Sequence, residues 1–226
     1  MEGSSLEINF EKCQLYGHPD LTSQCTLPGV STESDTYHWN YLGAPLTDES
    51  RMGFNTALDK MKLIADRLQT LATEFHQQSL LLLRQCTGVC RIEHLLRLTC
   101  NVELAGELCF PTIELVKSTT QHILQVQALP ESVWQLISMP SKFGGLGIRD
   151  PRDEWSAASL SCAYSVAEKV GELTSSDEYM NRFLCTTKAH YTSQSGKSPD
   201  DLHGNFMCKH QMVEAIYNRK FQEVPR

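Results

Sequence analysis

One pair of adjacent acidic side chains in this 226-residue chain could, by residue type, take part in catalysis. Two carboxylates on a rigid strand turn can hold the pair of divalent ions, about 4 Å apart, that nucleotidyl transfer uses. Asp200 and Asp201 are adjacent, but they follow Ser198 and Pro199 in a polar segment with no apolar strand beside it. Proline and short polar residues are typical of linkers. We therefore interpret this pair as a solvated loop or a helix cap.

Thiols and imidazoles suggest a second kind of site, for zinc. Cys86 and Cys90 are four residues apart, which is one turn of a helix, and His203, Cys208 and His210 lie near the other end of the chain. A structural zinc ion needs four such ligands that converge. No second pair has the spacing of a zinc finger, so we favour core thiols and surface histidines. A zinc-binding helical domain stays open as an alternative.

Basic residues could bind a phosphate backbone. Arg84 and Arg91 are seven residues apart in a segment expected to be one helix, so they should share a face. Such a pair could contact phosphates, or it could belong to an ordinary solvated face. The formal net charge of the chain is -7, which argues against tight stand-alone binding of nucleic acid but permits a local basic stripe.

A glycine-rich segment interrupts the pattern of apolar residues. Gly144, Gly145 and Gly147 could be a dinucleotide-binding loop, but that loop needs a preceding strand in a βαβ unit. A backbone clamp of the KH type has a similar spacing, but the surrounding strands are missing. We favour a tight corner between two helices, in which glycines permit positive φ and close packing. Asp150 would cap the next helix and Pro151 would begin it.

The elements that must position these residues are expected to be mainly helices. Apolar residues recur at three- and four-residue steps along most of the chain after residue 47, as in amphipathic helices. Gly88 is expected to bend the second of these helices, and Pro111 is expected to kink or split the third. A short helix carries Trp134. The other expected helices span residues 48–72, 74–98, 103–127, 177–190 and 205–222. One more helix is expected to begin at Asp150–Pro151 and to end near residue 170.

Short strands are expected only near the N-terminus. Residues 6–16 and 38–46 resemble short strands, and the glycine- and proline-containing residues 17–36 between them resemble a loop. The fold class predicted is mainly α with a small β portion. We expect three parts: residues 1–46 with the strands, 47–170 as a helical body, and 171–226 as a helical segment of open role that starts with a loop at 171–176.

Composition restricts the class of protein. Hydrophobic residues make up 41% of the chain, which suits a protein with a core, and none of the apolar runs reaches the length of a membrane span. The first residues lack the basic and apolar regions of a signal peptide. Nine scattered cysteines, an odd number, indicate free thiols. We expect an intracellular protein, cytoplasmic or nuclear, and neither secreted nor bound to a membrane.

Several phrases in a fixed order carry a family resemblance: LEINFEKC, YLGAPL, LLLRQCTGVCRIEHLLRL, LPESVWQLISMPSKFGGLGIRDP and AASLSCAYSV. Together they resemble the distal half of a reverse transcriptase from non-LTR-like retroelements of animals, over roughly residues 6–166. The pieces GGLGIRDP and LLLRQC with LLRL are the most specific. The resemblance implies that the N-terminal strands are the end of a polymerase palm. It also implies that the helices are the thumb and its connection.

The resemblance also implies roles for single residues. Lys12 matches a lysine near the incoming nucleotide that helps pyrophosphate to depart, as an acid or an electrostatic stabiliser. Arg84, Arg91 and Arg149 would contact the backbone of a template–primer duplex, although Arg149 could instead pair with a nearby acid. The palm's Tyr-x-Asp-Asp turn has no counterpart in this chain.

Without these carboxylates, magnesium has no ligands, so we expect no cofactor and no polymerase activity. The expectation is therefore a fragment of a retroelement polymerase, from a truncated or decayed gene, that binds a template–primer duplex weakly at most. The alternative is a helical protein-interaction module whose apolar groove opens where the palm would have packed.

Overall fold

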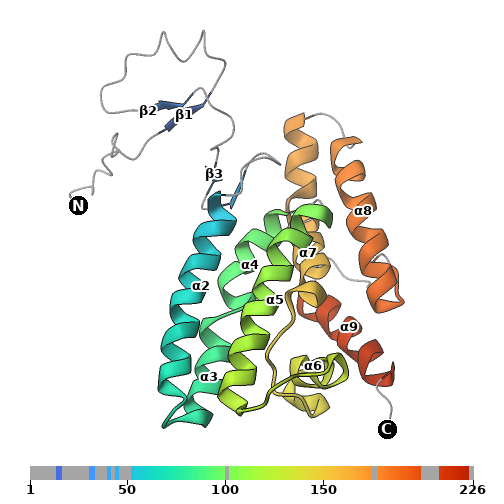
Figure 1. Cartoon of the computed structure of the whole chain (residues 1–226). Helices are drawn as coiled ribbons and strands as arrows, with labels where there is room; N and C mark the ends of the chain where they lie inside the picture. Colours follow the sequence, from blue (N-terminus) through green and yellow to red (C-terminus); the bar gives the residue numbers. More distant parts are fainter. Residues whose placement is uncertain are drawn as a thin grey trace, which may run out of the picture. The chain divides into compact units, whose positions relative to one another are not determined.

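The computed structural model describes residues 14–16, 31–33, 40–41, 44–45, 52–99, 102–174, 178–199 and 209–223. The chain divides into two compact units, Met1–Gly53 and Phe54–Arg226, which we describe separately. The second unit is built from helices (Figure 1). The prediction of a mainly helical fold is confirmed.

Two short strand pairs are described in the first unit. Strand β1 (Gln14–Tyr16) pairs in parallel with β2 (Ser31–Glu33), and β3 (Asn40–Tyr41) pairs antiparallel with β4 (Ala44–Pro45). Strand β2 corrects the prediction of a loop over residues 17–36. Its three polar residues show no apolar alternation that would mark a strand, and it pairs through its backbone. Lys12 lies outside the described residues.

Helix α2 (Met52–Leu71) follows the predicted amphipathic pattern. Its buried side chains Phe54, Met61, Ala65 and Leu68 recur at steps of seven, four and three residues, which place them on one face. The start expected at Thr47 lies outside the described residues.

The helix predicted over residues 74–98 is two helices in the structure. Helix α3 (His76–Cys86) ends before Thr87, and α4 (Val89–Leu98) begins after Gly88. Gly88 has a φ of +63°, which lies in the left-handed region that glycine adopts without steric cost. The prediction of one continuous helix is therefore wrong. The expectation that Arg84 and Arg91 share one helical face is wrong for the same reason, because they lie on different helices.

We expected Pro111 to kink or split the helix that contains it. Helix α5 (Val102–Leu124) runs through Pro111 as one helix, so the split does not occur. Proline inside a helix costs about 3 kcal/mol because it removes one donor and crowds the preceding turn. Here α5 packs against both α3 and α7 and buries large apolar side chains such as Leu108 and Ile113. Burial of several such side chains, at about 1.5–3 kcal/mol each, offsets the cost of the proline.

The remaining elements are α6 (Glu131–Ser138), the short helix η3 (Ser141–Phe143), α7 (Pro151–Thr174), α8 (Glu178–Ser195) and α9 (Lys209–Glu223). The short helix around Trp134 was predicted. The loop expected at 171–176 is wrong for residues 171–174, which continue α7. The part boundary expected after residue 170 therefore falls inside α7.

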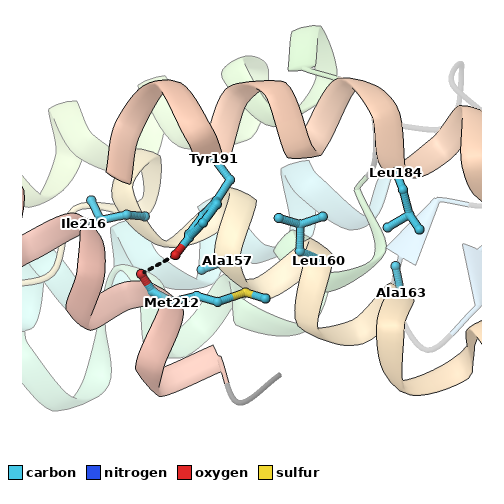
Figure 2. Packing of buried hydrophobic residues seen from close by; sticks show 7 residues of the cluster. All are labelled: Ala157, Leu160, Ala163, Leu184, Tyr191, Met212 and Ile216. Carbon is cyan, nitrogen blue, oxygen red and sulfur yellow. Dashed lines mark hydrogen bonds between the residues drawn. The ribbon is translucent and has the colours of Figure 1, made fainter. Parts of the chain in front are cut away.

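Helix α7 is central to the second unit. It packs against α4 and α5, and also against α8 and α9 (Figure 1). Figure 2 shows one apolar cluster where α7, α8 and α9 meet. Small side chains on α7, Ala157 and Ala163, allow close approach, and Tyr191 on α8 donates its hydroxyl to the Met212 carbonyl at 3.4 Å. Within the described ranges, no helix is both long and apolar enough to cross a membrane.

Candidate nucleic-acid interface

The glycine-rich segment forms the corner between α6 and α7. Its backbone folds onto the end of α6: the Leu146 amide donates to the Ile137 carbonyl at 3.1 Å, and the Gly147 amide donates to the Met139 carbonyl at 2.8 Å. Gly144 and Gly147 have φ values of +85° and +70°. The corner therefore needs glycines for its backbone conformation, and it contains neither a strand nor a βαβ unit.

Asp150 ends the corner and caps α7. Its Oδ1 accepts the Arg152 amide at 2.9 Å, and its Oδ2 accepts the indole N–H of the buried Trp134 at 3.0 Å. The Arg152 guanidinium adds an ion pair at 2.6 Å. Burial raises the pKa of Asp150, but the bonds from Arg152 and Trp134 outweigh it and hold the pKa below its usual value. Asp150 and Pro151 thus begin α7 as expected.

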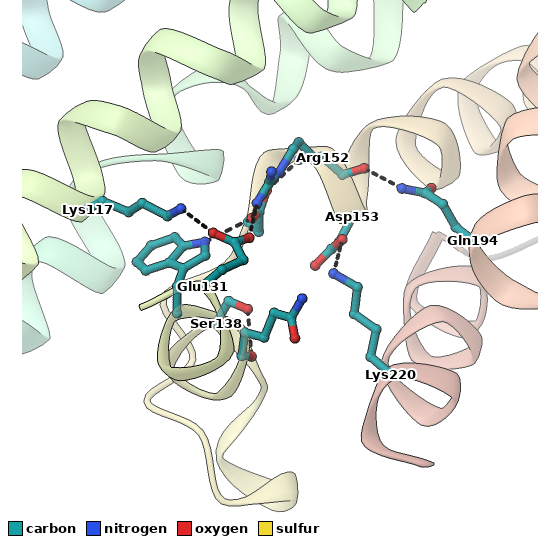
Figure 3. Close-up of polar contacts among 10 residues, drawn as sticks. Lys117, Glu131, Ser138, Arg152, Asp153, Gln194 and Lys220 are labelled. Carbon is teal, nitrogen blue, oxygen red and sulfur yellow. Dashed lines mark hydrogen bonds and ion pairs between the residues drawn. The ribbon is translucent and has the colours of Figure 1, made fainter. Parts of the chain in front are cut away.

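An exposed ion-pair chain extends from this cap to α5 and α6. Glu131 accepts Lys117 at 2.7 Å and Arg152 at 3.3 Å (Figure 3). Lys117 also lies over the Trp134 ring, 5.3 Å from its centroid. Hydrogen bonds from Lys117 lower the pKa of Glu131 despite partial burial. Because both partners of Glu131 reach solvent, these pairs orient the elements more than they stabilise them.

Two further acids in the first turn of α7 are buried and paired with α9. Glu154 binds Arg149 at 3.0 Å and Lys209 at 2.8 Å, and Lys209 also reaches Glu93 on α4 at 3.1 Å. Asp153 pairs with Lys220 (Figure 3). Burial raises the pKa of Asp153 to about 6, although the Lys220 charge opposes this. The first turn of α7 therefore ties α4 and α9 to the corner through charge.

Two adjoining cavities lie beside the corner. The larger has a volume of about 610 Å³ and the smaller about 500 Å³, and both are lined by Pro140 and Arg149. We call them together the corner groove. Its charged lining is Arg84 and Arg149 with Lys142 and Lys209, opposed by Glu93, Glu154 and Glu214, and His210 adds an imidazole.

The structure brings together two of the three arginines predicted to bind nucleic acid. Arg84 is exposed and lines the smaller cavity, close to Gly147. Arg149 lines both cavities and pairs with Glu154. From the sequence, Arg149 was expected either to contact nucleic acid or to pair with an acid, and the structure shows the acid pair. Arg91 is not a lining residue of either cavity; its Nε donates to the Cys86 carbonyl at 3.0 Å, at the end of α3.

Sequence reasoning did not place Lys142, Lys209 or His210 at this groove. Lys142 lies two residues before Gly144, and Lys209 and His210 begin α9. Lys142 could have been found from its place in the corner segment. Lys209 and His210 lie more than sixty residues further along the chain, and nothing in their local pattern marks a contact with the corner.

The zinc alternative finds no support in the described part of the chain, where no group of histidine, cysteine and acidic side chains is placed to hold a metal. Asp200, Asp201, His203 and Cys208 lie outside the described residues. Cys90 is exposed, which corrects the expectation of a core thiol, and its Sγ accepts an Arg149 N–H at 3.4 Å.

Comparison of the chain with protein-family models, with curated proteins and with solved structures finds no match in any of the three.

Proposed function

We propose that the helical unit is a non-catalytic nucleic-acid-binding module that holds the phosphate backbone of a duplex in the corner groove. The observation that carries this proposal is the convergence of Arg84, Lys142 and Arg149 on two adjoining cavities. They come from α3, from η3 and from the segment before α7. Cations from separate elements that meet in a groove are the arrangement that backbone contacts require.

The charge balance of the groove makes the expected binding weak. Arg149 and Lys209 form ion pairs with the buried Glu154, so each would bind a phosphate less strongly than an unpaired cation would. Arg84 and Lys142 are exposed, and the Lys142 side chain keeps 49% of its accessible surface while paired with Glu214. Two available cations correspond to about two phosphate contacts, and a slope of log affinity against log salt near −2.

We further propose that the module derives from the thumb and connection of a retroelement reverse transcriptase, and that the strands of the first unit are a palm remnant. The ordered phrases of the sequence support this origin. Polymerase chemistry is not part of the proposed function, because the chain contains no Tyr-x-Asp-Asp turn to hold catalytic magnesium.

Removing the two available cations tests the proposed binding. The double variant Arg84→Ala with Lys142→Ala should bind a fluorescein-labelled RNA–DNA duplex at least tenfold more weakly than wild type in 50 mM salt. The slope of log affinity against log salt should fall by about 2, because each lost phosphate contact removes about 1. Fluorescence anisotropy from 50 to 200 mM salt measures both quantities.

The control is Lys62→Ala with Lys169→Ala, which removes two exposed lysines from α2 and α7. It lowers the net charge equally, by two positive charges, and should bind within twofold of wild type. If wild type does not bind at 50 mM salt, or if both double variants lose affinity equally, the corner groove is not the binding site.

A further inference from the structure

Glu214 on α9 pairs with one of the two cations that the proposed function leaves available. Its carboxylate accepts the Lys142 ammonium, which lies 72 residues earlier in the chain, so the pair joins α9 to η3. The two elements also meet through the rings of Phe143 and Phe221, whose centroids are 5.2 Å apart. Lys142 Nζ lies 5.0 Å from the centroid of the Phe143 ring. These contacts hold the Lys142 ammonium beside α9, in the lining of the larger cavity.

Glu214 differs in its exposure from the other two acids that line the larger cavity. Its side chain keeps 39% of its accessible surface, whereas Glu93 keeps 27% and Glu154 only 1%. Glu154 also accepts both Arg149 and Lys209, so moving it would leave partly buried cations without this partner. Glu214 can turn into solvent without such a cost, because exposed ion pairs are weak. It is therefore the acid of the corner groove that can most easily leave its cation.

A carboxylate and a phosphate compete for the same lysine. Both present negatively charged oxygens that accept hydrogen bonds, and an ammonium contacts either of them as a point charge. The hydrogen bond from Lys142 lowers the pKa of Glu214, so this side chain is ionised at neutral pH. In the free protein, the Glu214 carboxylate therefore occupies the ammonium that a phosphate oxygen of the duplex would have to contact.

We propose that Glu214 is an autoinhibitory contact, whose carboxylate must leave Lys142 before a duplex backbone can bind in the corner groove. This inference rests on the proposed function. It makes the affinity of the groove depend on one exposed side chain of α9. The helix itself stays in place, because Met212 and Ile216 anchor it in the core. Removing the charge of Glu214 should therefore strengthen binding without any rearrangement of the helices.

The variant Glu214→Gln tests the proposal. Glutamine keeps the size of the side chain but no longer attracts the ammonium by charge. This variant should bind a fluorescein-labelled RNA–DNA duplex about threefold to fivefold more tightly than wild type in 50 mM salt, a gain of the size of an exposed ion pair. The matched control is Asp59→Asn, which removes one negative charge from the exposed pair with Lys62 on α2. It should bind within about 1.5-fold of wild type, because salt screens a charge that is not at the groove.

A second substitution separates the direct contact from a general effect of charge. In the Lys142→Ala background, Glu214→Gln should change the affinity by less than about 1.5-fold, because the cation that it releases is gone. A gain of equal size with and without Lys142 would overturn the inference. An equal gain in Asp59→Asn, or equal affinities of Glu214→Gln and wild type, would also overturn it, and all three results would leave the proposed function standing. Failure of both wild type and Glu214→Gln to bind the duplex would overturn both proposals.

Discussion

Replacing Gly145 with alanine is expected to destabilise the helical unit by about 3 kcal/mol or more. A Cβ atom at this position would lie 2.0 Å from the Met139 carbonyl oxygen and 2.6 Å from the Leu136 carbonyl oxygen. Both atoms belong to the backbone, so no side chain can rotate away to make room. The end of α6 would have to move, and the bond from the Gly147 amide to Met139 would be lost with it.

Gly106→Ala is the control for this substitution. Gly106 lies inside α5, and an added Cβ would meet no atom within 4 Å. Alanine is favoured over glycine in a helix interior, so this variant should gain about 0.5–1 kcal/mol. Urea unfolding followed by tryptophan fluorescence measures both effects. A Gly145→Ala protein within 0.5 kcal/mol of wild type would show that the corner does not have the described backbone.

Replacing Asp150 with alanine should cost about 3–5 kcal/mol, because it removes the partner of several buried groups at once. The Trp134 indole N–H would lose its acceptor inside the core, and α7 would lose its cap. The Arg152 guanidinium would lose its closest carboxylate. Asp150→Asn keeps an oxygen for the cap or the indole, so it should cost clearly less.

Asp59→Ala is the control, because Asp59 forms an exposed pair with Lys62 and its loss should cost about 0.5 kcal/mol or less. The pH dependence follows from the lowered pKa of Asp150 in the folded state. Its contribution is present above the unfolded pKa, about 3.9, and is lost as the pH falls through the lower folded pKa. The cost of Asp150→Ala should therefore shrink in acid. A cost that is independent of pH, or equal to that of Asp59→Ala, would contradict this role.

Local patterns in the sequence predicted much of this fold. The spacing of Met61, Ala65 and Leu68 predicts the buried face of α2, because helical periodicity is a local property. Asp150 and Pro151 predict the start of α7 for the same reason. At Gly88 the sequence predicted only a bend in one helix, because the apolar pattern continues on both sides of this glycine.

Contacts between distant segments explain what the sequence could not show. Glu154 and Lys209 are fifty-five residues apart, and their pairing depends on how α9 packs against α7. Pro111 signals a break, but the packing of α5 on α3 and α7 overrides that local preference. The candidate site was predicted in part: Arg84 and Arg149 were named, whereas Lys209 joins the site only because α9 packs beside the corner.

Chemical protection of lysines is the most direct test of the central claim that the corner groove binds a nucleic-acid backbone. Lys142, Lys62 and Lys169 are all exposed, and each pairs with an acidic side chain, so all three are accessible to an acylating reagent. Brief acylation with and without excess RNA–DNA duplex, followed by mass spectrometry, reports each lysine separately. We predict that the duplex protects Lys142 severalfold and leaves Lys62 and Lys169 unchanged. Equal labelling of Lys142 with and without a duplex that is shown to bind would contradict the account.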